Sequence, residues 1–290
     1  MFTRILLLIP VLLLSPISLF GQRIQDDFNE WVVFKVKSID DFFERFNGER
    51  NTEIDAYLRA NYPEMVPDRQ QWIRSVFNLD NEELRNDSLV ARFILEVTDS
   101  VQPRFLNYVD NHWYAEVECY VNDKLKLYPL KLILKVKKSS DASFRWSVVS
   151  ANAGFLKRAD GSPASADTST PFADSSQKYF LNPVSHGIDF LNLDKFFKSR
   201  TQVRNYLHQQ KNNTFETEKL VKMISKGELH FKQVRKIRYY MLQIKGWILE
   251  VDYFNRPGRN TGWLVNNLTK VSSAEKREFM TNQLFIPMNK

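Results

Sequence analysis

The sequence predicts an α+β protein built from two similar units, and three observations carry this prediction. Apolar residues recur at helical spacing up to residue 78, and beyond it they alternate with polar residues at strand spacing. The same succession of patterns returns from residue 185 onward, after a stretch of small and polar residues. We therefore expect a first domain at 31–156, a flexible linker at 157–184 and a smaller second domain at 185–290.

The composition is that of a folded protein rather than a disordered one. Hydrophobic residues make up 43% of the 290 residues and aromatic residues 13%, which is enough for packed cores. The single cysteine, Cys119, excludes an intramolecular disulfide, and the four histidines do not have the spacing of a zinc site. We therefore expect neither a metal nor a cofactor. The formal charge of +7 is modest and is expected for a soluble protein whose surface carries a small excess of positive charge. The alternative is that this charge favours binding to an anionic partner.

The amino terminus has the layout of a signal peptide. A basic start at Arg4 precedes the apolar run 5–14, Ser15-Pro16 breaks the run, and Gly21 offers a small residue for cleavage. The run is too short to span a bilayer as a stable helix, and no later stretch reaches 18 apolar residues. We expect cleavage near Gly21 and a periplasmic or secreted mature chain without a transmembrane span. An uncleaved membrane anchor is the alternative.

Three helices are predicted at the start of the first unit. Phe42, Phe43 and Phe46 recur at helical spacing after Ser38, a second short helix ends at Pro63, and Pro67-Asp68 opens a third. Period-two alternation then predicts four strands, at 89–97, 113–121, 128–136 and 144–148. Each has one apolar and one mixed face, which indicates an antiparallel sheet covered on one side.

The second unit echoes the first in the same order. Leu193-Asp194-x-Phe196-Phe197 matches Ile39-Asp40-x-Phe42-Phe43, Trp247-x-x-Glu250-Val251 matches Trp113-x-x-Glu116-Val117, and Trp263-x-Val265 matches Trp146-x-Val148. Strands are predicted at 229–244, 247–255 and 262–271, followed by a helix at 273–284. These echoes favour a duplication. The alternative is that amphipathic helices followed by a sheet recur because both patterns are common.

Three helices feeding a curved antiparallel sheet resemble the NTF2-like (cystatin-like) superfamily, possibly in two tandem copies. The resemblance is one of element order and covers most of 31–156 and, more loosely, 188–284. It implies a cone in which the helices fill the concave side of the sheet. Enzymes of this superfamily place a catalytic Asp or His beside Tyr deep in the cone, and the matching candidates are Tyr57, Asp110, His112 and Tyr114. A lone cystatin-like sheet with one helix is the nearest competitor.

The candidate ligand-binding residues of the first cone combine these polar groups with aromatic side chains. Trp113 and Trp146 lie on apolar strand faces, where core packing is the default and an aromatic ligand platform is the alternative. The candidate set is Tyr57, His112, Tyr114, Trp113 and Trp146.

Other chemistry-bearing residues have simpler structural explanations. Glu116 and Glu118 share a strand face and could form an acid–base pair, but cross-strand ion pairs with Arg92, Lys131, Lys135 or Arg145 explain them better. Cys119 is expected to be an inert core residue. The basic strands 131–138 and 232–238 could bind nucleic acid, yet lysines also protect strand edges and an exported protein rarely meets nucleic acid.

The sequence contains no phosphate loop, nucleophile elbow or metalloprotease motif. We therefore expect an exported, non-enzymatic binding or scaffold protein of the cell envelope, whose partner is another protein or an envelope component. The alternative is a small-molecule carrier, or an isomerase- or lyase-like enzyme, that uses the cone pocket of the first domain.

Overall fold

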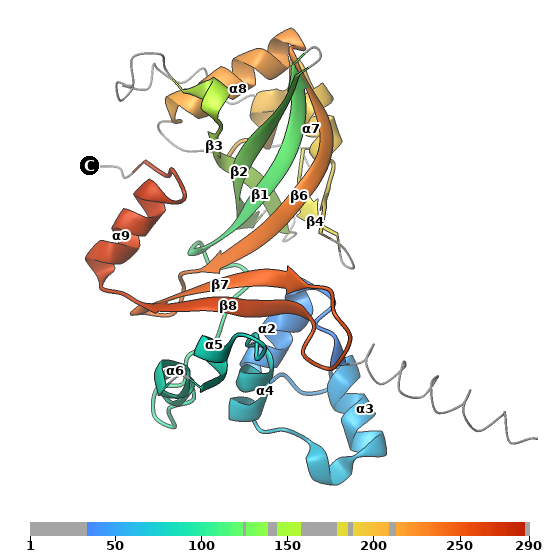
Figure 1. The fold of residues 1–290 in the computed structure, drawn as a ribbon, viewed down its shortest axis with the longest axis vertical. Coiled ribbons are helices and arrows are strands. Elements are labelled where there is room, and N and C mark those ends of the chain that lie inside the picture. The colour runs from blue at the N-terminus through green and yellow to red at the C-terminus, as the bar shows by residue number, and fades with distance from the viewer. Residues whose placement is uncertain are drawn as a thin grey trace, which may run out of the picture.

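The computed structural model consists of helices packed against one curled, six-stranded antiparallel sheet (Figure 1). It describes residues 34–86, 88–123, 126–138, 144–157, 179–184, 188–208 and 213–287. The predicted signal peptide and most of the predicted linker lie outside these residues. Within them, no helix has the length and apolar character needed to cross a membrane. The predicted α+β class is confirmed.

The strands of both sequence halves join in a single sheet. Its strands are β1 (Trp113–Asp123), β2 (Lys126–Lys138), β3 (Phe144–Asn152), β6 (Leu229–Met241), β7 (Trp247–Phe254) and β8 (Gly262–Lys270). Their order is β3-β2-β1-β6-β7-β8, and every pair is antiparallel. β1 and β6 pair along the centre, from Trp113 opposite Met241 to Asp123 opposite Leu229. A separate two-stranded ribbon pairs β4 (Asn182–Pro183) with β5 (Phe190–Leu191).

The first half supplies most of the helices. They are α2 (Ile39–Asn47), α3 (Glu53–Asn61), the 3₁₀ turn η1 (Pro63–Met65), α4 (Arg69–Ser75), α5 (Glu82–Asn86) and α6 (Ser88–Val97). Ser38 and Asp68 start α2 and α4 with capping boxes, in which each side chain accepts a backbone N–H three residues later. Gly48 ends α2 in the left-handed conformation. These local signals explain why the three predicted helices before residue 78 are present.

The prediction of a strand at 89–97 was wrong, because this segment forms α6. Its buried residues are Val90, Phe93, Ile94 and Val97, which recur at helical spacing. The strand pattern had placed Leu95 on the same face as Phe93, whereas Leu95 is 62% exposed. Nearly every residue of the run is apolar, so both periods fit it, and packing against the sheet decides between them. Arg92 therefore lies on a helix and not on a neighbouring strand.

The first half ends with the 3₁₀ turn η2 (Gly154–Leu156). The second half contributes α7 (Leu193–Lys198), the 3₁₀ turn η3 (Val203–Tyr206) and α8 (Phe215–Lys226). The predicted terminal helix is present as α9 (Ser273–Asn282). α9 and the segment after it lie against the second face of the sheet, where Leu284 and Ile286 pack beside Tyr240 and Ile248. The hydroxyl of Ser150 donates to the Leu284 carbonyl at 2.6 Å.

Some helices of each half lie against the outermost strand of the other half: α2 and α5 contact β8, and α8 contacts β3, whereas α7 contacts β6 of its own half. The helices α2, α4 and α5 of the first half lie below β7 and β8, and α7 and α8 lie against the sheet end formed by β1, β2, β3 and β6 (Figure 1). Short backbone bridges close both sheet edges: Val36 and Phe77 pair with β8, and Leu181 and Leu207 pair with β3. The two halves are interleaved through one sheet.

The space between the helices and the sheet is filled by aromatic side chains. The rings of Trp113 and Trp146 meet at 4.6 Å between centroids, and Tyr239 lies 4.8 Å from Trp263. Trp247 contacts Phe93 of α6 at 5.2 Å and donates its indole N–H to Glu96 at 2.8 Å. The aromatic residues named here belong to one buried cluster that contains residues of both halves. Glu96 lies outside this cluster and binds the Trp247 indole from its edge.

Candidate functional site: a groove between α4 and α6

The structure brings only two of the five predicted ligand-binding residues into contact. Trp113 and Trp146 pack together in the core, and the Trp113 indole donates to the Tyr108 carbonyl at 2.9 Å. Both rings are buried on all sides by neighbours such as Phe43 and Phe190. At these positions they act as packing residues.

The other three predicted residues lie apart from this pair and from one another. Tyr114 points to the opposite face of the sheet, where burial raises the pKa of its hydroxyl to about 12. Tyr57 lies on α3 in a small satellite cluster and contacts Tyr62 at 6.2 Å. The His112 side chain is 63% exposed, and its Nδ1 lies 2.7 Å from Asp110 Oδ1. These three side chains therefore lie on α3, on β1 and in the loop before β1, in different surroundings.

The paired carboxylates of β1 form cross-strand ion pairs with Lys131, one of the four predicted cations, and with Arg235, which was not predicted. Lys131 Nζ lies 3.1 Å from Glu116 and 3.4 Å from Glu118, and Arg235 Nη1 lies 3.0 Å from Glu118. The Tyr240 hydroxyl also donates to Glu116 at 3.4 Å. Since each carboxylate already faces a cation, the pair serves sheet cohesion rather than proton transfer.

The second acid pair is held in the same way on β7. Arg238 donates Nε and Nη2 to Asp252 at 2.9 and 2.8 Å, and its Nη1 lies 2.9 Å from Glu250. Burial raises the pKa of the Asp252 carboxyl, but the hydrogen bonds and charges of Arg238 and Lys236 outweigh burial and leave the pKa below its usual value. The basic residues at 235, 236 and 238 are thus neutralised by acids within the sheet.

Cys119 and possible metal ligands complete the set of reactive side chains considered from the sequence. Cys119 is buried on the apolar side of β1, and burial raises the pKa of its thiol to about 12, so the reactive thiolate is suppressed. Among the residues that the structure describes, no three His, Cys, Asp or Glu side chains gather as a metal site would require.

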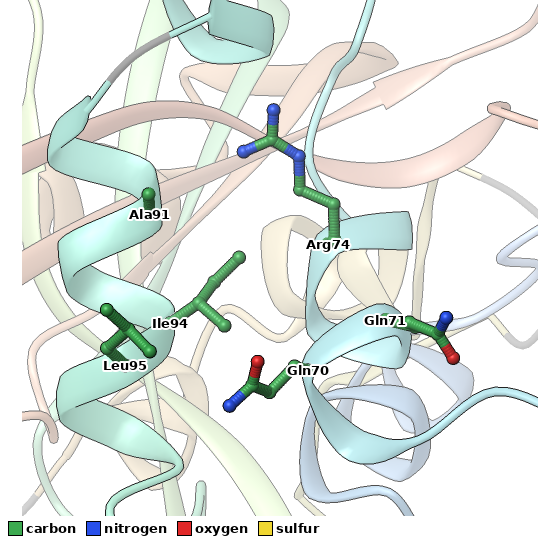
Figure 2. Close-up of a pocket in the computed structure, with 6 residues that line it drawn as sticks. All are labelled: Gln70, Gln71, Arg74, Ala91, Ile94 and Leu95. Atoms are coloured by element: carbon green, nitrogen blue, oxygen red, sulfur yellow. The ribbon is translucent and has the colours of Figure 1, made fainter.

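A surface groove of about 340 Å³ lies between α4 and α6 (Figure 2). Its lining residues are Gln70, Gln71, Arg74, Ala91, Ile94 and Leu95. The α6 wall is apolar, and Ile94 points from it toward α4, while Gln70 of α4 points back toward α6. Gln71 points away from α6, and Arg74 lies at one end of the groove. The polar groups of the α4 residues are engaged elsewhere: Gln70 donates to the Thr98 hydroxyl at 3.1 Å, Gln71 accepts from the Asp68 amide at 2.9 Å, and Arg74 donates to the Arg85 carbonyl. The exposed lining of the groove is therefore mainly apolar.

Exposed apolar side chains also occur in the segment that follows α6 along the chain. We call Leu95, Val101 and Phe105 the apolar rim; they are 62%, 83% and 52% exposed. The segment after α6 folds back because the Arg104 amide donates to the Val97 carbonyl at 2.9 Å. Arg69 of α4 holds the same carbonyl at 3.0 Å and stacks its guanidinium 4.0 Å from the Phe105 ring. The rim is thus held in place beside the groove.

Sequence reasoning missed this groove because it assigned 89–97 to a strand. If 88–97 had been assigned a helical period, Ala91 and Leu95 would have been placed on the exposed side, opposite the buried Phe93. That exposed apolar stripe is the sequence signal from which the groove could have been predicted. The position of α4 across from it depends on tertiary packing.

Comparison of the chain with protein-family models, curated proteins and solved structures gives no match.

Proposed function

We propose that this chain is an exported, non-enzymatic binding or scaffold protein of the cell envelope, built from two NTF2-like units. The observation that carries the proposal is the contrast between the interior and the surface. The place where a cone would hold a ligand contains the packed rings of Trp113, Trp146, Tyr239 and Trp263. The outer surface carries a groove with an exposed apolar rim. Exposed apolar side chains gathered in one place are typical of protein interaction sites.

The two-unit part of the proposal is supported by the symmetric strand order. β3 and β8 are the outermost strands, and they carry the matched pairs Trp146-x-Val148 and Trp263-x-Val265. α2 and α7, which carry the matched Phe-Phe pairs, precede them in their halves. The Trp113 and Trp247 echo adds no support, because β1 and β7 hold different places in the strand order. On this proposal the units are interleaved, each covering the outermost strand of the other.

Export is tested by fractionating cells that express the full chain with a carboxyl-terminal tag. We expect the protein in the envelope or medium, with an amino terminus near Gln22. Retention of the intact chain in the cytoplasm would refute the location.

Partner binding is tested by placing a photo-crosslinking amino acid at Leu95 or Val101 in the native host. Glu53 of α3, whose side chain is 78% exposed, is the matched control position. We expect one discrete protein adduct from the rim positions and none from the control. If no position on the outer surface yields an adduct, and a small metabolite instead raises the melting temperature, the chain is a carrier and the proposal fails.

A further inference from the structure

We propose that Lys135 of β2 is a reactive amine that captures a small aldehyde as an imine. It lies on the second face of the sheet, the face that carries Tyr114 and Tyr240. The inference goes beyond the proposed binding function and does not depend on it. Three observations carry it: the position of the amine beside a tyrosine ring, the absence of an acid partner, and the contrast with neighbouring lysines.

Lys135 lies between two neighbouring strands in one row of side chains across the sheet. Its cross-strand neighbours are Tyr114 on β1 and Ser147 on β3, and directly opposed residues share a face with Cβ atoms about 4.5–5.5 Å apart. Ile133 shares this face and belongs to the apolar cluster that also contains Tyr114. Lys135 Nζ lies 5.6 Å from the centroid of the Tyr114 ring. The side chain is half-buried, so the amine is partly withdrawn from water and still accessible to a small molecule.

This amine has no acid partner, whereas other lysines of the sheet do. Lys131, earlier on β2, lies 3.1 Å from Glu116, and Lys236 of β6 lies 3.1 Å from Asp252. Among the described residues, no carboxylate lies within ion-pair distance of Lys135 Nζ, and this atom donates no hydrogen bond to them. The protonated form of Lys135 therefore lacks the stabilisation that a carboxylate gives to Lys131 and Lys236.

A second half-buried lysine shows why the missing partner matters. Burial lowers the pKa of Lys135 and also that of Lys276. For Lys135, the charge of Asp110 opposes the effect of burial only in part. Lys276 Nζ, however, donates to the Leu242 and Ile244 carbonyls, both at 2.8 Å. Lys135 thus combines a lowered pKa with a nitrogen that no other group holds, which is the setting of a nucleophilic amine.

The reaction open to such an amine is imine formation. The nitrogen lone pair of the neutral amine adds to the carbonyl carbon, and one N–H proton moves to the oxygen to give a carbinolamine. The carbinolamine then loses its hydroxyl group and the second N–H proton as one water molecule, and no oxidant or reductant is consumed. A small aldehyde fits best, because its single substituent reduces crowding at a half-buried nitrogen. The product is a stoichiometric adduct without turnover, which is compatible with a non-enzymatic protein.

The probe is propanal with sodium cyanoborohydride, which reduces each imine to a stable secondary amine. The mature protein is treated at neutral pH, and peptide mass spectrometry follows the modified fraction of each lysine over time. Three lysines are internal controls: the ion-paired Lys131, the carbonyl-bound Lys276, and Lys35, whose Nζ lies 5.2 Å from the centroid of the Tyr253 ring. We expect Lys135 to be modified at least about threefold faster than the controls, since each unit of lowered pKa raises the neutral fraction about tenfold. In urea the four lysines should react at similar rates.

Ser147 offers a pair of variants that test the missing acid. Ser147→Asp places a carboxylate opposite Lys135, and Ser147→Asn has nearly the same shape without the charge. The Ser147 hydroxyl lies 3.1 Å from His208 Nδ1, so both variants alter the same contact. We expect the Asp variant to slow modification of Lys135 to the rate of Lys131, and the Asn variant to leave it fast. Melting temperatures check that both variants are folded.

Equal modification of Lys135 and Lys131 in the native protein would overturn the inference. So would a preference for Lys135 that persists in urea, or a rate that Ser147→Asp leaves unchanged. Fast acetylation of Lys135 by an activated ester without capture of propanal would show a reactive amine and reject the aldehyde site. None of these results bears on the proposed binding function, which the crosslinks from the outer surface test separately.

Discussion

Gly262 is the position where a single added carbon should disturb the fold most directly. It begins β8 with a φ of +94°, and a Cβ built there would lie 2.0 Å from the Val36 carbonyl oxygen and 2.6 Å from its carbon. The Val36 backbone is this close because it bridges to β8. Its amide donates to the Thr261 carbonyl and its carbonyl accepts from the Trp263 amide, both at 3.0 Å. Gly262→Ala therefore forces the first-half segment off the second-half edge strand.

The cost follows from two contributions. Holding an L-residue at this φ costs about 1–3 kcal/mol. Moving Val36 away breaks two backbone hydrogen bonds worth about 0.5–1.5 kcal/mol each. We expect Gly262→Ala to lower the free energy of unfolding by about 2–6 kcal/mol, before any loss from exposing the buried Val36 side chain.

Two other glycines separate these contributions. Gly258 also has a positive φ, +102°, but no atom lies within 4 Å of the added Cβ, so Gly258→Ala should show the conformational cost alone. Gly154 has open space and no positive φ, so Gly154→Ala should change stability by less than about 1 kcal/mol. Urea unfolding followed by tryptophan fluorescence measures all three. If Gly262→Ala is no more destabilising than Gly258→Ala, the close approach of Val36 is wrong.

Three further predictions test the packing and the charges. Phe93→Ala, which empties a fully buried site on α6, should cost about 3–5 kcal/mol in urea unfolding, while Leu95→Ala should cost less than about 1 kcal/mol; equal costs would contradict the helix. Asp252→Asn should cost about 2 kcal/mol at pH 7, because a charge-assisted bond to Arg238 is lost. Folding lowers the pKa of Asp252, so its contribution is fully present above the unfolded pKa near 3.9 and is lost as the pH falls through the lower folded pKa. The gap in unfolding free energy between the wild type and this variant should therefore shrink steadily as urea titrations are moved below about pH 3.9; a constant gap would contradict the ion pair. Cys119 should react with a thiol reagent only in denaturant, and rapid reaction of the native protein would show that it is accessible.

Much of the local structure could be predicted because local signals agree with one another. Ser38, the Phe42, Phe43 and Phe46 stripe and Gly48 start, bury and end α2 within ten or so residues. The alternation from Trp113 onward likewise survives in β1, because one face meets a core and the other meets cross-strand charges. The charges of Glu116 and Glu118 were predicted to pair across strands for the same reason.

The candidate site could not be predicted in this way. In 89–97 apolar residues stand on every side, so strand and helix periods both fit, and packing of Val90, Phe93 and Val97 into the core, with Phe93 against Trp247, selects the helix. The groove needs α4 and α6 side by side, and the rim needs Arg69 to reach the Val97 carbonyl from another helix.

The sequence by itself determined the α+β class, the positions of the caps and most strands, and an apolar amino-terminal run followed by two similar patterns. The tertiary structure decided that β1 and β6 pair, that the halves share one sheet, and that some helices of each half lie against the other's outermost strand. Periodicity reports only which face of an element is buried, since it arises from a few neighbouring residues. Periodicity does not say which distant strand or helix covers that face. Many segments with the same pattern could pair across a long chain separation, and the packing of the complete fold selects one of them.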